Sequence, residues 1–583
     1  MTRIVAFGDS YADDGNLFEL LGIPRPAAYP TGRFSGGTNF IDTMSQILAV
    51  PVDNFAIGGA FTNNGNINGP GIPGFVTEYQ SFLAGGGPAA FPRVSGTFGP
   101  NDLLAISIGG NDARAYRISG GTVAGAAAAA APRVAQATTG LTALVNAGAR
   151  NITYLAGDVG RLPEAVGSPS AAAGSAFSSA FNTGMQSSLA NFAANGVIVN
   201  YLDLNLIGDR ITANPGAYGL VSAGACTGGA AGPTACVASP ELANQYLFYV
   251  DQVHLSSAGF AIVARYAVRQ LEAPLQFQAQ PEVGLQAASG LGSTLLGRLD
   301  LSSARSGRAQ QGFSAYLTGN IARRNVDRTL TNFAYDMETL GGTGGVEYAG
   351  VTSVFGAAVN YSNGEASTSV GEAEAKAIQL ALYGGWGGTN GGFVEGYAGY
   401  GWVDYDFTRA AVIDDIVGET DGNNVFAGAR AGYLFGTDQL RFGPVIGLSY
   451  AKADLDAYTE TGDAVLTLNV GEQEVKVLTG SAGVEARASY EIGGMSFLPY
   501  AQATLEKDFE GDSRTIRYAG TASPTIVNSF VLPEQSKDLH GRLTGGASIA
   551  LANALSLEVN ASGTIEREDG NDFSALIGVK LGF

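Results

Sequence analysis

Histidine, cysteine and tryptophan are nearly absent from this chain, which has two of each in 583 residues. So few imidazoles and thiols leave no cluster with the ligand spacing of a zinc site. The Gly109-Gly110 pair lacks the spaced third glycine of a dinucleotide-binding turn, and Asp13, Asp14 and Asn16 lack the rest of a calcium loop. We therefore expect neither a metal nor a cofactor.

Positive charge is also scarce. The chain has 32 lysines and arginines against 52 aspartates and glutamates, a formal net charge of −20. Such a protein has no basic surface with which to neutralise phosphates, so nucleic acid is excluded as a partner. We attribute the acidity itself to solubility and mutual repulsion.

Long apolar runs are missing as well. No stretch of eighteen or more apolar residues occurs, which excludes a recognisable transmembrane helix. Yet the mean hydropathy is +0.11 and only 14% of residues are charged, and this combination indicates alternating apolar residues, as in the strands of a membrane β-barrel. No signal peptide precedes the first predicted strand, so we expect an exported protein to be represented here by its mature form.

The two cysteines, Cys226 and Cys236, lie ten residues apart in a loop rich in glycine, alanine and proline. One closely spaced pair is typical of a local disulfide in an oxidising compartment. Two idle thiols are the alternative that the spacing alone leaves open.

The length predicts at least two domains, and the first, residues 1–272, has the pattern of an α/β protein. Short apolar runs alternate with helical stretches at 39–48 and at 123–149, the second of which we expect Pro132 to interrupt. The strand-like runs are 4–7, 52–55, 103–108, 152–155 and 197–202. This alternation predicts a parallel sheet covered by helices on both faces.

From residue 312 to residue 583 the hydrophobic period changes to two. We count about twelve strand-like segments, and the connections between them alternate between long and short. The long connections include 408–422, 457–474 and 511–539, and the short ones include 436–438 and 492–494. This order is typical of an antiparallel outer-membrane β-barrel.

An even number of strands puts both ends of such a barrel on the short-turn side. A preceding domain on the other side can then be reached only through the pore. Residues 273–311 form a linker and a helix of small residues, which is long enough to span the pore.

Four segments of the first domain carry candidate catalytic residues, each after a predicted strand or in a late loop. They are Gly8-Asp9-Ser10, Asn54 to Gly59, Gly109-Gly110-Asn111-Asp112 and Asp251-Gln252-Val253-His254. The carboxyl ends of parallel strands meet at one edge of a sheet, where such folds bind their ligands. We therefore expect these four segments to converge.

Ester hydrolysis is the chemistry that these residue types favour. A serine nucleophile needs a base that accepts its proton near neutral pH, and His254 is almost the only imidazole available to Ser10. Asp251 would hold the imidazole tautomer. The backbone amides of Ser10 and Gly59 and the side-chain amide of Asn111 could bind the oxyanion.

Three further polar residues receive no catalytic role. We expect Asp9 and Asp112 to orient loops. His540, near the end of the long loop before a barrel strand, is interpreted as a solvated loop or rim histidine.

The four segments resemble the blocks of the GDSL (SGNH) hydrolases, which supply Ser, Gly, Asn and His, matched here by Ser10, Gly59, Asn111 and His254. The segments 14–16 and 29–35 resemble the lipase-like branch of that family. The first block reads Gly-Asp-Ser-Tyr rather than Gly-Asp-Ser-Leu. The resemblance covers about residues 1–270 and implies a three-layer, flavodoxin-like fold.

The second half resembles an autotransporter β-domain, with Phe583 as its terminal aromatic residue. Together the halves resemble EstA-like esterase autotransporters. That resemblance implies a passenger domain (1–272) at the cell surface, a linker and pore-spanning helix (273–311) and a 12-stranded barrel (312–583) in outer-membrane lipids. It also implies recognition of the C-terminal strand by the assembly machinery, and favours the Cys226–Cys236 disulfide.

The predicted function is therefore hydrolysis of short- to medium-chain acyl esters at the cell surface. Two alternatives stay open. The enzyme could instead remove acetyl groups from carbohydrate, or the hydrolase fold could be a vestige in an adhesin-like surface protein.

Overall fold

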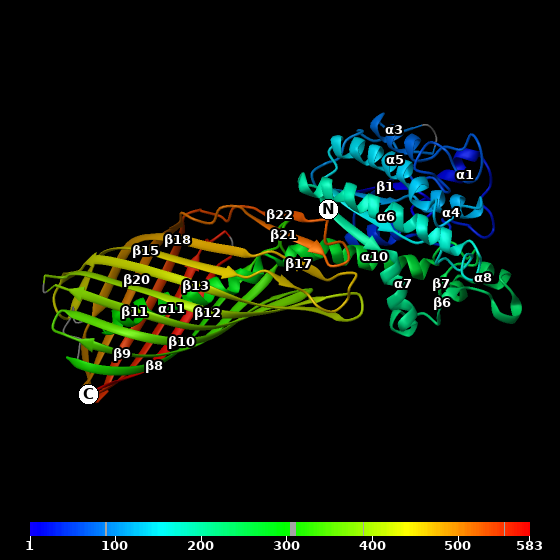
Figure 1. Ribbon diagram of the computed structural model, residues 1–583. Coiled ribbons are helices and arrows are strands. Elements are labelled where there is room, and N and C mark those ends of the chain that lie inside the picture. The colour runs from blue at the N-terminus through cyan, green and yellow to red at the C-terminus, as the bar shows by residue number, and fades with distance from the viewer. Residues whose placement is uncertain (88–89, 303–310, 389, 553, 569) are drawn as a thin grey trace.

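The computed structural model describes residues 1–87, 90–302, 311–388, 390–552, 554–568 and 570–583. An α/β domain lies at one end of a long β-barrel, and the C-terminus lies at the other end (Figure 1). Among the described residues, no helix is both long and apolar enough to cross a membrane.

The α/β domain is built on a parallel sheet whose described strands run in the order β2-β1-β3-β4-β5. The strands are β1 (Arg3–Gly8), β2 (Val52–Asn54), β3 (Asp102–Ser107), β4 (Asn151–Ala156) and β5 (Ile198–Asp203). Every residue of β3 is buried, because a parallel strand in the middle of this sheet is covered on both faces.

Helices cover both faces of this sheet and make two separate apolar cores. On one face α3 (Phe75–Leu83), α5 (Ala126–Asn146) and α6 (Ala171–Ala194) pack against the sheet. On the other face lie α2 (Phe40–Leu48), α7 (Leu204–Ala213) and α10 (Ser257–Glu272). The remaining short elements are α1 (Asn16–Leu21), α4 (Gly110–Ile118), α8 (Thr234–Ala238), α9 (Pro240–Ala243), η1 (Pro215–Tyr218), η2 (Gly229–Ala231), β6 (Ser222–Ala225) and β7 (Tyr246–Phe248). The predicted three-layer α/β fold is confirmed.

Pro132 does not interrupt its helix. Helix α5 runs through Pro132 without a break. The proline and Ala128, four residues earlier, are both exposed. Solvent can therefore satisfy the Ala128 carbonyl that loses its amide partner.

The second half forms a closed antiparallel barrel of twelve long strands within the residues described. The strands are β8 (Gly312–Val326), β9 (Tyr335–Ala349), β10 (Ser353–Thr368), β11 (Gly371–Gly387), β12 (Gly392–Ala410), β13 (Asp415–Tyr433), β15 (Leu440–Leu455), β18 (Gln473–Ala488), β20 (Met495–Asp508), β23 (His540–Ala552), β24 (Leu555–Ile565) and β25 (Asp572–Gly582). Pairing of β25 with β8 and of β13 with β15 closes the ring. Burial alternates along strands such as β10, with apolar side chains outside and polar ones in the lumen, as a membrane barrel requires.

Helix α11 (Ala279–Ser302) follows the short turn η3 (Ala273–Gln276) and lies inside the barrel, in contact with strands around most of the wall. Small residues on the helix are needed for this fit. A Cβ atom at Gly284 would collide with the hydroxyl of Tyr405, and one at Gly292 with that of Tyr397. Of the predicted linker and helix, residues 303–310 lie outside the described part of the chain.

Buried charges also join α11 to the wall of the barrel. Arg298 pairs with Glu347 and Glu558. Asp300 pairs with Arg430 and Arg487. Because a buried charge is costly without its partner, these contacts hold the helix at one depth in the lumen.

One predicted loop is wrong. Residues 408–422 are mostly strand, because β12 and β13 pair out to Ala410 and Asp415. The polar side chains there do not end the strands, since a hairpin keeps its backbone hydrogen bonds in water. The other two long connections, 457–474 and 511–539, contain β16 (Tyr458–Thr459), β17 (Leu468–Val470), β21 (Arg514–Gly520) and β22 (Asn528–Leu532), which form a small sheet. Two short strands, β14 (Phe435–Gly436) and β19 (Tyr490–Ile492), lie next to tight turns.

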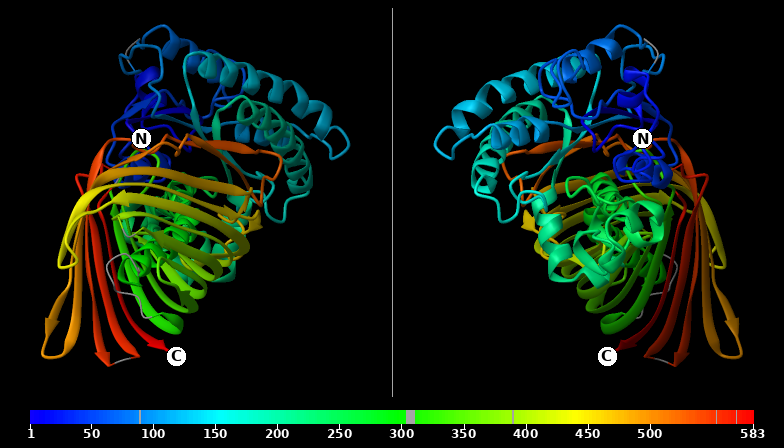
Figure 2. Two further views of the ribbon diagram at one scale, coloured as in Figure 1. Left: turned by 90° about the vertical axis from the view of Figure 1, so that its left-hand side faces the viewer. Right: turned by 90° about the vertical axis from the view of Figure 1, so that its right-hand side faces the viewer.

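The long connections lie at the end of the barrel that carries the α/β domain. The side views in Figure 2 show this domain seated over β21 and β22, drawn in orange. Asn528 of β22 contacts the backbone of Val199 in edge strand β5. It accepts from the Val199 amide at 2.8 Å and donates to the Val199 carbonyl at 2.9 Å. Strand β22 therefore covers the β5 edge of the α/β sheet, where backbone amides and carbonyls could otherwise pair with another chain.

Candidate active site

Ser10 lies directly after β1, where the chain makes a sharp turn. Gly8 has a φ of +114°, and a Cβ atom there would collide with the carbonyl of Ser107 on the neighbouring strand. The amide of Asp9 donates to that same carbonyl at 2.8 Å. The close approach of β1 and β3, which needs a glycine, thus sets the direction in which Ser10 leaves the sheet.

Ser10, His254 and Asp251 form a continuous chain of contacts. The hydroxyl Oγ of Ser10 lies 2.7 Å from Nε2 of His254, and Nδ1 of that ring lies 2.7 Å from Oδ2 of Asp251. The other carboxylate oxygen, Oδ1, accepts hydrogen bonds from the amides of Val253 and His254 at 3.0 and 2.9 Å. The turn from Asp251 to His254 therefore holds the carboxylate and the imidazole in one fixed relation.

The carboxylate of Asp251 is ionised under all ordinary conditions. Burial opposes ionisation, but the adjacent His254 and the two donating amides outweigh it and lower the pKa of Asp251 to about 2. A negative charge next to Nδ1 favours the tautomer with its proton on Nδ1. The free lone pair of Nε2 then faces Ser10.

Tyr29 also contacts this carboxylate, and sequence reasoning gave it no role. Its hydroxyl donates to Oδ2 of Asp251 at 2.7 Å. The residue lies in the segment 29–35 that resembles the lipase-like branch. No spacing in the sequence indicates a contact between residues 222 positions apart.

Two of the three expected oxyanion donors, Gly59 and Asn111, come from loops that touch each other. The side-chain amide of Asn111, at the start of α4, donates to the carbonyl of Ala60 at 3.3 Å. Gly59 occupies the same turn with a φ of +82°, a conformation that favours glycine. Ser10 and Asn111 line one cavity.

Asp9 and Asp112 lie in the loops around this site as acceptors. Asp9 accepts from the amide of Tyr11 at 3.1 Å and from the hydroxyl of Ser107 at 3.0 Å. Asp112 accepts from the amide of Thr62 at 2.9 Å and from its hydroxyl at 3.2 Å. Burial raises the pKa of each carboxyl to about 6. Asp9 thus links the loop after β1 to the end of β3, and Asp112 links the start of α4 to the loop that follows Gly59.

His540 lies in the barrel, outside this site. It is at the end of a strand, as a rim position predicts, but its side chain is buried and the expected solvation is wrong. It is 5% exposed and begins strand β23, where it pairs with Glu506 across the barrel wall. Its Nε2 lies 3.5 Å from Oε2 of Glu506. The strand begins at this residue rather than after it, so the ring belongs to a cross-strand pair.

Cys226 and Cys236 form a disulfide, with Cα atoms 6.2 Å apart. Both cysteines pack in a small cluster with Tyr249, which directly precedes the turn of the Asp251 and His254 segment. Tyr29 packs against the same cluster. The disulfide therefore packs next to the chain segment that leads into Asp251.

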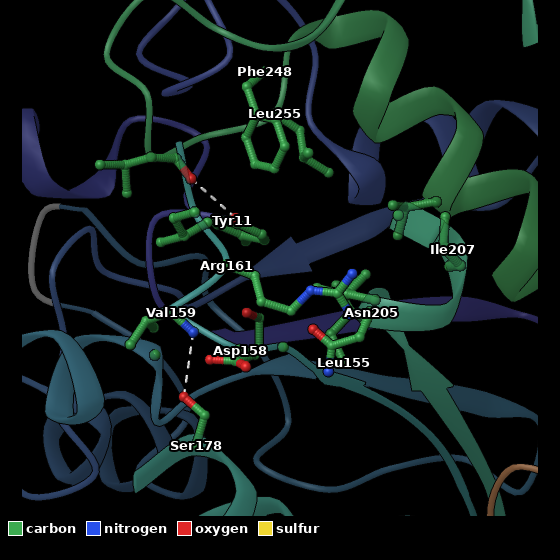
Figure 3. Close-up of a pocket in the computed structure, with 18 of the residues that line it drawn as sticks. Tyr11, Leu155, Asp158, Val159, Arg161, Ser178, Asn205, Ile207, Phe248 and Leu255 are labelled. Atoms are coloured by element: carbon green, nitrogen blue, oxygen red, sulfur yellow. Dashed lines mark hydrogen bonds between the residues drawn. The ribbon is translucent and has the colours of Figure 1, made fainter. Parts of the chain in front are cut away.

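A cavity of about 510 Å³ opens beside Ser10. Figure 3 shows part of it, with Leu155, Val159, Ile207 and Phe248 around the space. The apolar residues that line it are Ile108, Leu155, Val159, Leu162, Pro163, Val166, Phe181, Leu204, Ile207, Ile211, Ala223, Leu247, Phe248, Val253, Leu255 and Val263. Its size falls within the roughly 300–1,000 Å³ of small-molecule sites.

Comparison with known proteins matches both halves of the chain. Residues 4–267 match the family model GDSL-like Lipase/Acylhydrolase, and residues 315–562 match the Autotransporter beta-domain. The solved translocator domain of autotransporter NalP from Neisseria meningitidis is 17% identical. It has a TM-score of 0.42 and covers 52% of this chain and 98% of its own.

Curated relatives include Lipase 1 of Photorhabdus luminescens, 24% identical over 403 residues, which are 67% of this chain and 58% of that protein. Esterase EstA of Pseudomonas aeruginosa is 24% identical over 70% of this chain and 64% of its own length. A Pseudomonas putida protein, described as an uncharacterized protein in the trpE-trpG intergenic region, is 25% identical over 91% and 92%. The chain thus spans less than two thirds of Lipase 1 and of EstA. By these two matches, residues 4–267 are a GDSL-like lipase/acylhydrolase domain and residues 315–562 are an autotransporter β-domain of the outer membrane.

Proposed function

We propose that the protein hydrolyses short- to medium-chain acyl esters at the cell surface through Ser10, His254 and Asp251. The observation that carries this proposal is the unbroken series of contacts from the Ser10 hydroxyl through the imidazole to the Asp251 carboxylate. Such an arrangement supplies a nucleophile, a general base and an orienting carboxylate.

The reaction proceeds in two halves. Oγ of Ser10 attacks the ester carbonyl while Nε2 of His254 takes its proton, and the imidazolium then protonates the departing alcohol. Water then attacks the acyl-serine while the same nitrogen takes its proton. The bond between Oγ of Ser10 and the acyl carbon breaks, the imidazolium returns the proton to Oγ, and the acid is released. The amides of Ser10 and Gly59 and the side chain of Asn111 stabilise the oxyanion in each half.

The apolar cavity beside Ser10 supports an acyl chain as the bound group. Hydrocarbon surface gains about 25 cal/mol per Å² when it leaves water, and the lining offers this environment next to the nucleophile. Polar side chains such as Asp158, Arg161 and Asn205 also line the cavity, but apolar residues make up the larger part of its wall. The apolar lining therefore favours acyl esters over acetylated carbohydrate.

The difference in loop length between the two ends of the barrel supports exposure of the passenger domain at the cell surface. Barrels of this kind have short periplasmic turns and longer extracellular loops. The long connections lie at the end that carries the α/β domain, and the C-terminus at the other end. We therefore place residues 1–272 outside the cell, 273–311 through the pore and 312–583 in the membrane. We also propose that the outer-membrane assembly machinery recognises the C-terminal strand.

The decisive experiment compares Ser10→Ala with Ser187→Ala, a matched variant of an exposed serine on α6. We expect Ser10→Ala to abolish hydrolysis of p-nitrophenyl butyrate and labelling by a fluorophosphonate, while the barrel still assembles. Ser187→Ala should keep both. Undiminished hydrolysis by Ser10→Ala would disprove the mechanism.

A second experiment tests the position of the passenger domain. Protease added to intact cells should remove the α/β domain and leave the barrel in the membrane. A domain that stays protected until the outer membrane is lysed would contradict exposure at the surface.

A further inference from the structure

The barrel connection of residues 456–472 reaches into the α/β domain with a buried carboxylate, Asp463, which is 1% exposed. Its Oδ2 accepts a hydrogen bond from the hydroxyl of Tyr266 at 2.8 Å and lies 3.0 Å from Nε of Arg210. Its Oδ1 accepts from the amide of Val465 at 3.0 Å, which fixes the carboxylate within its own turn. The barrel thus places one charge between two side chains of the α/β domain.

Those two side chains belong to helices on the same face of the sheet. Arg210 lies on α7, and Tyr266 lies on α10, the helix that follows His254. The hydroxyl of Tyr218 lies 2.7 Å from that of Tyr266 and extends the network. Asp414, from the β12–β13 hairpin, pairs with Arg210 at 3.3 Å. Two barrel connections therefore meet at one arginine of α7.

Helix α7 is a wall of the cavity beside Ser10. Six of its residues line the cavity: Leu204, Asn205, Ile207, Gly208, Ile211 and Thr212. Ile207 and Ile211 belong to the same apolar cluster as Val465 and Leu466 of the barrel connection. Ile207 and Ile211 of α7 therefore line the cavity and also share an apolar core with the barrel connection.

A second contact holds the other side of α7, and it is weaker. Asp209 pairs with Arg161, whose side chain Figure 3 shows among the residues of the cavity. Both partners are about half exposed, at 56% and 46%. Exposed ion pairs contribute little to stability. The contact with Asp463 is therefore the firmer of the two that set the place of this helix.

We propose that Asp463 is a positioning residue for the substrate site, which holds α7 through Arg210 and thereby sets the shape of the acyl cavity. The inference rests on the proposed ester hydrolysis and goes beyond it. The barrel then contributes to chain-length selectivity in addition to anchoring the enzyme. Loss of Arg210 leaves the buried charge of Asp463 without compensation, and loss of the Asp463 charge leaves Arg210 with only the exposed Asp414. In either case α7 should shift and the deep part of the cavity should lose its shape.

The test uses the full-length protein and three single variants. Asp463→Asn removes the charge but keeps the size of the side chain, and Arg210→Gln removes the charge that faces it. Asp456→Asn is the matched control, because Asp456 is an exposed carboxylate in the same connection. Each variant is assayed for kcat and KM on p-nitrophenyl acetate, butyrate and octanoate. Heat-modifiable mobility on gels confirms that the barrel is assembled.

We expect Asp463→Asn and Arg210→Gln to raise KM for the octanoate by about 10-fold, the size of effect that a misfitted apolar pocket produces. Both kinetic constants for the acetate, which does not fill the cavity, should stay unchanged. The Asp456→Asn control should match the original protein on all three esters. This split between substrates would not arise from a general loss of stability.

An unchanged chain-length profile in both variants would overturn the positioning role, as would an equal fall on all three esters. If Asp463→Asn fails to assemble, Arg210→Gln decides, because it leaves the barrel connection intact. If the original protein hydrolyses none of the esters, the proposed function itself fails. If the original protein hydrolyses the esters and no variant changes its chain-length profile, only the positioning role is refuted and the proposed function stands.

Discussion

The hydroxyl of Tyr29 donates at 2.7 Å to Oδ2 of Asp251, the same oxygen that contacts the imidazole of His254. Oδ2 of Asp251 therefore has two partners, and Oδ1 is held by two backbone amides. Tyr29 thus fixes the carboxylate that fixes His254. Burial and the negative charge of Asp251 raise the pKa of the Tyr29 hydroxyl, so it keeps its proton and stays a donor.

Tyr29→Phe should lower kcat for p-nitrophenyl butyrate by about 10-fold and leave KM unchanged, because one charge-assisted hydrogen bond contributes about 1.5–3 kcal/mol. Tyr249→Phe is the matched control. Its hydroxyl donates to the carbonyl of Ala28 at 2.8 Å and not to the carboxylate of Asp251. Equal rates for Tyr29→Phe and the original protein would remove Tyr29 from the site.

Asp251 should also contribute to stability, with a defined pH window. Its pKa is lowered from 3.8 to about 2 in the folded protein. The contribution is therefore complete above pH ~4 and is lost as the pH falls through about 2, and at neutral pH it amounts to about 2 kcal/mol. Asp251→Asn should unfold more readily at neutral pH and show a smaller further loss between pH 4 and 2.

Thermal unfolding of the α/β domain, followed by circular dichroism across that pH range, measures this contribution. The same variant should lose activity by a factor on the order of 10⁴, because an amide at this position favours the wrong imidazole tautomer. Equal acid sensitivity in both proteins would show that the ionised carboxylate does not stabilise the fold.

Asn111→Ala should reduce kcat by about 10²–10³-fold with little change in KM, the cost of one oxyanion donor. The exposed Asn195 on the far side of the domain provides a matched control as Asn195→Ala. A rise in KM together with a fall in kcat would indicate instead that the Asn111 contact with Ala60 maintains the loop. The ratio of the two constants therefore separates catalysis from folding.

Replacing both cysteines by serine should destabilise the α/β domain by about 3 kcal/mol, because the disulfide no longer restrains the unfolded chain. The corresponding shift of its melting temperature is about 5–10 °C. The barrel transition, measured in detergent by the same method, should not move. An unchanged melting temperature of the α/β domain would show that the packing around Tyr249 suffices without the disulfide.

Much of the fold could be read from the order of the residues. The apolar run at 103–108 became the fully buried β3, and the period of two from residue 312 became twelve long strands in the described chain. The error at 408–422 has a physical origin, since polarity marks where strands leave the lipid and not where their hydrogen bonds end. His540 was misjudged for a related reason, because a strand can begin on the last residue of a polar loop.

The sequence by itself determined the residue types that the chemistry needs. With two histidines in the chain, the choice of a base for Ser10 was nearly made by composition, and alternating polarity determined which strand faces meet lipid. Only the tertiary structure decided which distant groups touch. The Tyr29 contact with Asp251 and the insertion of Asp463 between α7 and α10 span hundreds of positions. Such contacts depend on the positions that loops take in the folded protein. The local pattern of apolar and polar residues does not determine those positions.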